Sequence, residues 1–211
     1  MALTLSGTNG VVGAGFTLDA SGASVTAGVG TFSSVQGEIP AASIVGVCTA
    51  GLTRTGGFGK FASYAIIADQ KSAGSDAGTF TSGGWRTRDL NTELADPDGI
   101  VSISSNQFTL QAGSYLLNAK AMGFRVERHM IKLYQTSGTP ADIATGTSEY
   151  CPPTYIGSNS SFLSCRFTIS TATTYELQHR CQTTKSDNGF GEGFDAGVNE
   201  TFALVEIFKE A

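Results

Sequence analysis

The most unusual cluster of polar side chains in the sequence is the run DNGFGEGFD at residues 187–195. Its carboxylate and amide oxygens suit Ca²⁺, although the regular spacing of an EF-hand loop is absent. Aromatic rings on a glycine-rich loop can also give a partner contact area at a small entropic cost. A recognition loop, a calcium loop and an ordinary connection between strands are therefore all open. The candidates for receptor binding are Asp187, Asn188, Phe190, Glu192, Phe194 and Asp195.

No set of residues has the spacing of a catalytic or metal centre. His129 and His179 are the only histidines, and without a carboxylate at ligand spacing we expect them to be hydrogen-bonded between strands. The sequence contains no G-x-S-x-G nucleophile elbow and no pair of carboxylates at a recognisable glycosidase spacing. Its glycine-rich stretches lack G-K-[ST]. We therefore expect no enzymatic activity and no cofactor, and we assign no catalytic residue and no metal ligand.

The run Trp85-Arg86-Thr87-Arg88 has two interpretations. Arginine beside tryptophan can bind a glycan or a phosphate by stacking and by bidentate hydrogen bonds. Alternatively, the tryptophan covers the fold and the arginines pair with Asp89, Glu93 or an adjacent subunit. We favour the structural interpretation. A third recognition candidate, if the phenylalanines of residues 187–195 belong to the core, is the segment from Tyr150 to Ser160.

These residues belong to a chain of low charge. Only 15% of its 211 residues are charged, against roughly 25% in an average soluble domain, and the net charge is −5. Its hydrophobic content is too high for intrinsic disorder. The 27 glycines show no G-X-Y period, which excludes collagen. An acidic balance without a basic cluster argues against a nucleic-acid partner.

The sequence also bears on membranes and on redox chemistry. Its apolar stretches are far shorter than the roughly 20 residues of a membrane-spanning helix, so we expect no membrane insertion. The start MALTLSG has neither the basic region nor the apolar region of a secretory signal. We expect the four cysteines to be buried reduced thiols. A disulfide between two of the last three is the alternative to this expectation, and the cysteines are Cys48, Cys151, Cys165 and Cys181.

The composition changes near residue 60. Residues 1–60 contain 35 glycine, alanine, serine and threonine residues, and their charges sum to zero. Alternating pairs of apolar residues followed by turns, as in Phe16-Thr17-Leu18, favour short strands and loops. So few large side chains cannot close a core. We expect an extended segment that is ordered against sister chains or a larger assembly, with a flexible linker as the alternative.

Residues 61–211 predict an all-β sandwich or jelly roll, because short apolar or alternating runs follow one another with turns between them. A weak helical pattern at residues 140–144 is interpreted as a turn. The expected strands are Tyr64–Ala68, Ile100–Ile103, Phe108–Leu110, Ser114–Met122, Met130–Tyr134, Ser161–Ile169, Thr174–Cys181 and Thr201–Phe208.

This part of the chain resembles the C1q/TNF-like jelly-roll domains. The resemblance rests on four runs, which are Phe108-Thr-Leu-Gln-Ala-Gly113-Ser-Tyr115, Ile131-Lys-Leu-Tyr134, Tyr175-Glu-Leu-Gln and Phe202-Ala-Leu-Val-Glu-Ile-Phe208. In that family an apolar C-terminal strand runs close to a three-fold axis. The resemblance therefore implies a homotrimer, and the residues that we assign to its core or to the trimer contact are Trp85, Tyr115, Phe202 and Phe208.

A narrower resemblance is to the C-terminal domains of bacteriophage fibre proteins. It rests on residues 80–91, on Arg128-His129, on residues 177–181 and on the opening MALTLSG. It implies a virion protein made in the bacterial cytoplasm, with residues 1–60 attached to other virion proteins and residues 61–211 forming the jelly roll. A tail or neck fibre would bind a host cell-surface glycan or protein. A head fibre or capsid cement protein, stabilising and decorating the capsid, is the alternative.

Overall fold

The computed structural model describes residues 16–19, 22–25, 61–155 and 157–210. The chain divides into two units, Met1–Thr53 and Arg54–Ala211. In the first unit, β1 (Phe16–Asp19) and β2 (Gly22–Val25) form an antiparallel hairpin, which confirms the short strand predicted at Phe16. The other predictions for residues 1–60, including the virion-attachment role and the state of Cys48, lie outside the described residues.

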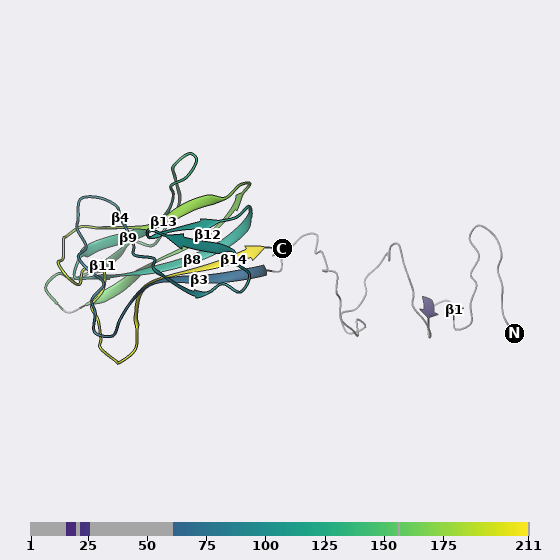
Figure 1. Ribbon diagram of the computed structural model, residues 1–211, viewed down its shortest axis with the longest axis horizontal. Coiled ribbons are helices and arrows are strands. Elements are labelled where there is room, and N and C mark those ends of the chain that lie inside the picture. Colours follow the sequence, from purple (N-terminus) through teal and green to yellow (C-terminus); the bar gives the residue numbers. More distant parts are fainter. Residues whose placement is uncertain (1–15, 20–21, 26–60, 156, 211) are drawn as a thin grey trace. The chain divides into compact units, whose positions relative to one another are not determined.

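The second unit is built from two antiparallel sheets (Figure 1). One sheet has the strand order β12-β8-β14-β3-β5, and its members are β3 (Phe61–Lys71), β5 (Thr92–Ala95), β8 (Gly113–Phe124), β12 (Ser158–Ile169) and β14 (Glu200–Glu210). The other has the order β10-β9-β13-β7-β6, with β11 on β9 and β4 on β13. Its members are β4 (Arg86–Thr87), β6 (Val101–Ser104), β7 (Gln107–Leu110), β9 (Glu127–Gln135), β10 (Ala141–Thr145), β11 (Glu149–Cys151) and β13 (Thr173–Cys181).

Alternation of apolar and polar residues decides which face of each strand is buried. Along β13, Tyr175 and Leu177 are fully buried, whereas Glu176 and Gln178, which alternate with them, face outward. The same period of two places Leu117 of β8 in the core between the sheets. A one-residue slip of either strand would turn this apolar set to solvent, so the pattern fixes the register.

The connections define the fold class. From β7 to β8, from β8 to β9, from β12 to β13 and from β13 to β14, the chain passes from one sheet to the other. Two antiparallel sheets joined by such crossings form a jelly-roll sandwich. The predicted all-β jelly-roll sandwich is thereby confirmed. The described residues contain no helix, and none of their elements is a helix that could span a membrane.

The four residues assigned to the core or the trimer contact lie in different environments. Tyr115 and Phe202 are buried. Phe208 is half-buried on the outer face of its sheet and packs on Phe61, with ring centroids 5.1 Å apart. Trp85 is half-buried and lies over the ammonium of Lys132.

One local prediction is wrong. Residues 140–144 were expected to form a turn, but Ala141–Thr145 is the edge strand β10, which pairs with β9. An ion pair between Lys132 and Asp142, with an N–O distance of 2.6 Å, joins the two strands. Pairing with the preceding strand therefore outweighs the weak local signal.

The two ends of the sandwich differ. Phe61 pairs with Glu210, so the start of β3 and the end of β14 lie at one end. The connections that we call the distal loops lie at the other end, near β4, β9 and β11 in Figure 1. They comprise residues 72–85 (β3–β4), 125–126 (β8–β9), 152–157 (β11–β12, with 156 outside the described residues) and 182–199 (β13–β14).

Candidate functional site

The distal loops 72–85 and 182–199 are joined by backbone hydrogen bonds. Phe80 and Lys185 exchange two N–H···O bonds of 2.9 and 3.0 Å, as neighbouring strands do. The Ser82 amide donates to the Thr184 hydroxyl over 2.9 Å. These bonds give both loops a defined shape, which a binding surface requires if it is to avoid an ordering cost.

The carboxylate of Glu200 fixes the far part of loop 182–199. It accepts hydrogen bonds from the backbone amides of Phe194 (2.8 Å), Asp195 (2.7 Å) and Gly74 (3.1 Å), so it joins both loops to the start of β14. These amides favour the ionised form and lower the pKa of Glu200. No group of three or more acidic, histidine or cysteine side chains in the described part of the chain could hold a metal ion.

The two phenylalanines of the predicted recognition loop lie in opposite environments. Phe194 is 84% exposed, as a contact residue for a partner would be. Phe190 is only half-exposed, in contrast to the exposed ring that a recognition loop would offer, and its role in binding stays a prediction. Its ring stacks on Phe80, with centroids 4.2 Å apart, and the guanidinium of Arg88 lies 4.3 Å from its centroid. Gly189 permits this packing because a Cβ there would lie 2.7 Å from the Cβ of Phe80.

The polar candidates of the same loop lie at its surface. The amide of Asp187 donates to the Thr79 hydroxyl, and the Asn188 side chain donates to the Glu192 carboxylate over 3.3 Å. Asp187 and Asp195 both have a positive φ, which short polar residues tolerate in tight loops. The role of the six residues in receptor binding stays a prediction.

Further apolar side chains are exposed at the distal end. Tyr155 is 76% exposed, and Tyr150, on β11 beside the same loop, is also exposed. Both belong to the segment from Tyr150 to Ser160, which the sequence identifies as a further recognition candidate. Together with Phe194 and Val198 of loop 182–199, they are apolar side chains that are exposed to solvent at the distal end. Exposed aromatic side chains of this kind are typical anchors of binding surfaces.

Beneath these loops lies a buried polar layer. Arg88 is completely buried and pairs with Asp69, with an N–O distance of 2.9 Å. Its guanidinium also donates to the carbonyl oxygens of Met122 and Phe190. The sequence interpretation that Arg88 pairs with Asp89, Glu93 or another subunit is therefore wrong. The ion pair instead ties β3 to the loop that carries Phe190.

Two buried histidines continue this layer. His129 and His179 are hydrogen-bonded to each other, and His129 is also bonded to Asn159. The exposed fraction is 3% for His129 and 0% for His179, so both residues are buried. Burial lowers the pKa of each, and for His179 the nearby charge of Arg88 acts in the same direction. These neutral rings match the structural role that the sequence predicts for them.

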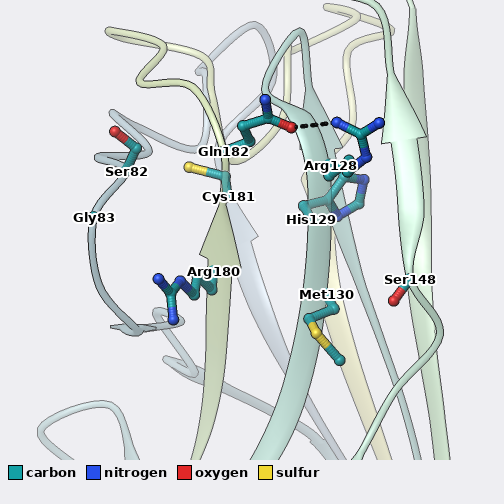
Figure 2. A pocket seen from close by; sticks show the side chains of 9 residues that line it. All are labelled: Ser82, Gly83, Arg128, His129, Met130, Ser148, Arg180, Cys181 and Gln182. Atoms are coloured by element: carbon teal, nitrogen blue, oxygen red, sulfur yellow. Dashed lines mark hydrogen bonds between the residues drawn. The ribbon is translucent and has the colours of Figure 1, made fainter.

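A groove of about 600 Å³ opens on the outer face of β9 and β13, beside the distal loops (Figure 2). In Figure 2 the Arg180 side chain extends toward the segment that contains Gly83, and Arg128 lies on the other side of the Cys181 strand. The remaining lining residues supply hydroxyl, amide and thioether groups, and the full set is Ser82, Gly83, Arg128, His129, Met130, Ser148, Arg180, Cys181 and Gln182. A volume in this range suits a small ligand.

The sequence does not identify this groove. Arg128 and Arg180 flank the two histidines in the sequence and belong to runs that carry the resemblance to fibre proteins, but neither fact indicates that they share a groove. Their meeting depends on the pairing of β9 with β13, in which Arg180 lies opposite Met130. Such a register is a property of the folded sheet, and neither strand encodes it alone.

Comparison with known proteins finds solved structures of TNF-type and C1q-type proteins that are similar to the jelly roll. No family model matches the chain, and no curated protein does. Murine APRIL at pH 5.0 is similar over 70% of this chain and 98% of its own, at 9% identity and a TM-score of 0.49. The globular domain of zebrafish complement 1qA matches over 70% and 96%, at 16% identity and a TM-score of 0.45. Eiger TNF from S. frugiperda matches over 72% and 94%, at 11% identity and a TM-score of 0.49.

Proposed function

We propose that this chain is a homotrimeric, non-enzymatic structural protein of a bacteriophage virion, a tail or neck fibre whose jelly roll binds a receptor on the host surface. In this proposal residues 1–60 attach to other virion proteins and the distal loops point away from the particle. The observation that carries it is the arrangement of the jelly roll. Tyr150, Tyr155 and Phe194 are exposed at the end opposite the start of β3, and Tyr155 and Phe194 are the most exposed aromatic side chains of the described residues.

The outer face of the β12-β8-β14-β3-β5 sheet supports the trimer. It contains a groove of about 440 Å³, whose lining includes Phe162, Leu204, Lys120 and Glu206. Phe162 is 55% exposed, and at the other end of the same face Tyr64 is also exposed. One chain leaves these apolar groups uncovered, and closed symmetric contacts between copies are the usual way to bury them. A lysine and a glutamate on one face also allow complementary contacts between identical subunits.

The phage assignment rests on the sequence resemblance to virion fibre proteins at residues 80–91 and at the N-terminus. Three copies in a trimer, and many trimers on a particle, would turn weak individual contacts into firm attachment. The described residues offer no competing catalytic centre. The buried histidines are hydrogen-bonded to each other, and Arg88 and Asp69 form a buried ion pair, so these groups support the fold.

An alternative within the same class is a head fibre or capsid cement protein. In that case residues 1–60 would clamp capsid subunits and the jelly roll would be displayed outward. The low charge and small side chains of this segment suit packing against other chains in either position.

An adsorption assay tests the proposal. Host cells are incubated with an excess of the purified full-length protein and then exposed to the phage. A receptor-binding fibre blocks adsorption, whereas a capsid decoration protein does not. In parallel, antibodies against the jelly roll are imaged on intact particles by electron microscopy. Label on the capsid without inhibition supports the alternative, and no label on any particle contradicts both.

A further inference from the structure

We infer that the groove between Arg128 and Arg180 binds an anionic saccharide, one that carries a phosphate or a carboxylate on the sugar. This inference rests on the proposed function, because it gives the receptor a chemical class and places its contact on the outer face of β9 and β13. The observations that support it are the positions of the two arginine side chains in the groove, in addition to the groove's volume.

The two arginines are neighbours that lack a counter-charge. On the outer face of the sheet, Arg180 lies opposite Met130, and the Gln182 amide bonds to the Arg128 carbonyl over 2.8 Å. Arg128 and Arg180 therefore occupy diagonal positions of an antiparallel pair, whose backbone positions lie about 7–8 Å apart. Their side chains lie on either side of the Cys181 strand (Figure 2), and an anion bound in the groove is attracted to both.

The carboxylates on β9, β13 and β11 accept hydrogen bonds from other side chains. Glu127 accepts a hydrogen bond from Thr183. Glu149 accepts one from Thr147, and Glu176 accepts bonds from side chains that include Gln107. The ion pairs found among the described residues of the jelly roll include neither Arg128 nor Arg180.

Arg128 is nevertheless held in a defined position. Its guanidinium donates to the Gln182 side chain over 2.9 Å, as Figure 2 shows, and lies 5.9 Å from the centre of the Tyr150 ring. A planar guanidinium held in place this way can present its remaining N–H groups to two oxygens of one anion. The Arg128 side chain therefore loses less conformational entropy when a ligand binds than a free side chain would.

The other walls fit a sugar rather than a bare ion. Arg86 donates to the carbonyl oxygens of Thr81 and Ser82, over 3.1 and 3.3 Å, and so fixes the segment that forms one side. The hydroxyls of Ser82 and Ser148 and the Gln182 amide can match sugar hydroxyls, while Met130 offers an apolar surface. Because the chain has a net charge of −5, general attraction to polyanions does not account for binding here.

The test compares three probes on the full-length protein by biolayer interferometry: phosphomannan, polyglucuronic acid and neutral dextran. We expect binding to phosphomannan or to polyglucuronic acid and none to dextran, and the probe that binds identifies the anionic group. The Arg128→Ala/Arg180→Ala variant should lose roughly tenfold or more in affinity, since each charged contact contributes substantially. Arg180→Lys should retain part of the binding, because lysine keeps the charge but loses the bidentate geometry.

The matched control is Lys185→Ala, which removes one positive charge from a distal loop without touching the lining of the groove. It should bind as the wild type does, and all variants should melt at the wild-type temperature because both arginines are exposed. Equal losses in the control and the double variant, or no binding to either anionic probe, would overturn the inference. If the double variant still blocks phage adsorption, the groove is not the receptor site although the proposed function stands. If the wild type fails to block adsorption, receptor binding itself is contradicted.

Discussion

Nδ1 of His129 lies 2.9 Å from Nε2 of His179, and the direction of this hydrogen bond is fixed by a third residue. The side-chain nitrogen of Asn159 donates to the Tyr150 carbonyl, so its oxygen faces Nε2 of His129 and accepts from it over 2.7 Å. His129 therefore carries its proton on Nε2 and accepts from His179 at Nδ1. Within the described part of the chain, the Nδ1 atom of His179 is buried without a partner.

These hydrogen-bonded, buried histidines make the stability of the jelly roll sensitive to acid. Burial and the charge of Arg88 lower the pKa of His179 well below its usual value of 6.5, so the unfolded chain takes up a proton more readily than the folded one. The free energy of unfolding is then undiminished above about pH 6.5 and falls as the pH drops below that value. Urea unfolding between pH 7.5 and 5.5 should show this loss, and His179→Gln should show a smaller one. A stability that rises on acidification in this range would contradict the arrangement.

The buried ion pair predicts a large effect of a single substitution. Arg88→Met leaves the Asp69 carboxylate buried without its main counter-charge, and this should reduce the free energy of unfolding by about 3–5 kcal/mol. The matched control is Arg88→Met/Asp69→Leu, in which no charge is stranded, and it should be more stable than the single variant. Equilibrium urea unfolding measures both. A double variant that is less stable than Arg88→Met would show that the charges are not coupled.

Phe190 and Phe194 should separate stability from recognition. Phe190→Ala removes a ring that packs on Phe80 and Arg88 and should cost about 2–3 kcal/mol, somewhat less than for a fully buried phenylalanine. Phe194→Ala should leave the melting temperature unchanged, because its side chain is almost fully exposed. Binding of the full-length protein to host cells should weaken for Phe194→Ala. Normal binding by that variant would move the recognition surface to the other distal loops.

The cysteines of the jelly roll should react slowly while the chain is folded. Cys151, Cys165 and Cys181 are free thiols, which agrees with the expected reduced state. Burial raises the pKa of the Cys165 and Cys181 thiols to about 11, so little reactive thiolate forms at pH 8. In a Cys48→Ser variant, an aromatic disulfide reagent should label the three thiols slowly in buffer and rapidly in urea. Fewer than three thiols in urea would reveal a disulfide instead.

Much of the fold is predictable because its long strands carry their own signal. The alternation of Tyr175, Leu177 and their polar neighbours identifies β13 without reference to any other segment. Edge strands such as Ala141–Thr145 carry too little of this pattern, and their conformation comes from pairing with β9. Local reasoning is reliable where burial repeats every two residues and fails where a partner strand decides.

The candidate site was less predictable for a related reason. Phe190 lies in a glycine-rich run that suggests exposure, but its packing partner Phe80 is 110 positions earlier in the chain. The pairing of Arg88 with Asp69 likewise depends on how β3 and the segment after β4 meet. Contacts between segments that are distant in sequence are set by the assembled sandwich. Residue types along one segment therefore cannot reveal them.

In the proposed trimer, other copies of the chain cover the exposed face of the β12-β8-β14-β3-β5 sheet. Multi-angle light scattering of the full-length protein at micromolar concentration measures this directly, and we expect three times the chain mass of 21.8 kDa. Phe162→Glu, which places a charge on that face, should shift the mass toward one chain. Phe194→Glu, an equivalent change in a distal loop, should leave it unaltered. A wild-type mass of a single chain, or a trimer that Phe162→Glu does not weaken, would contradict the account.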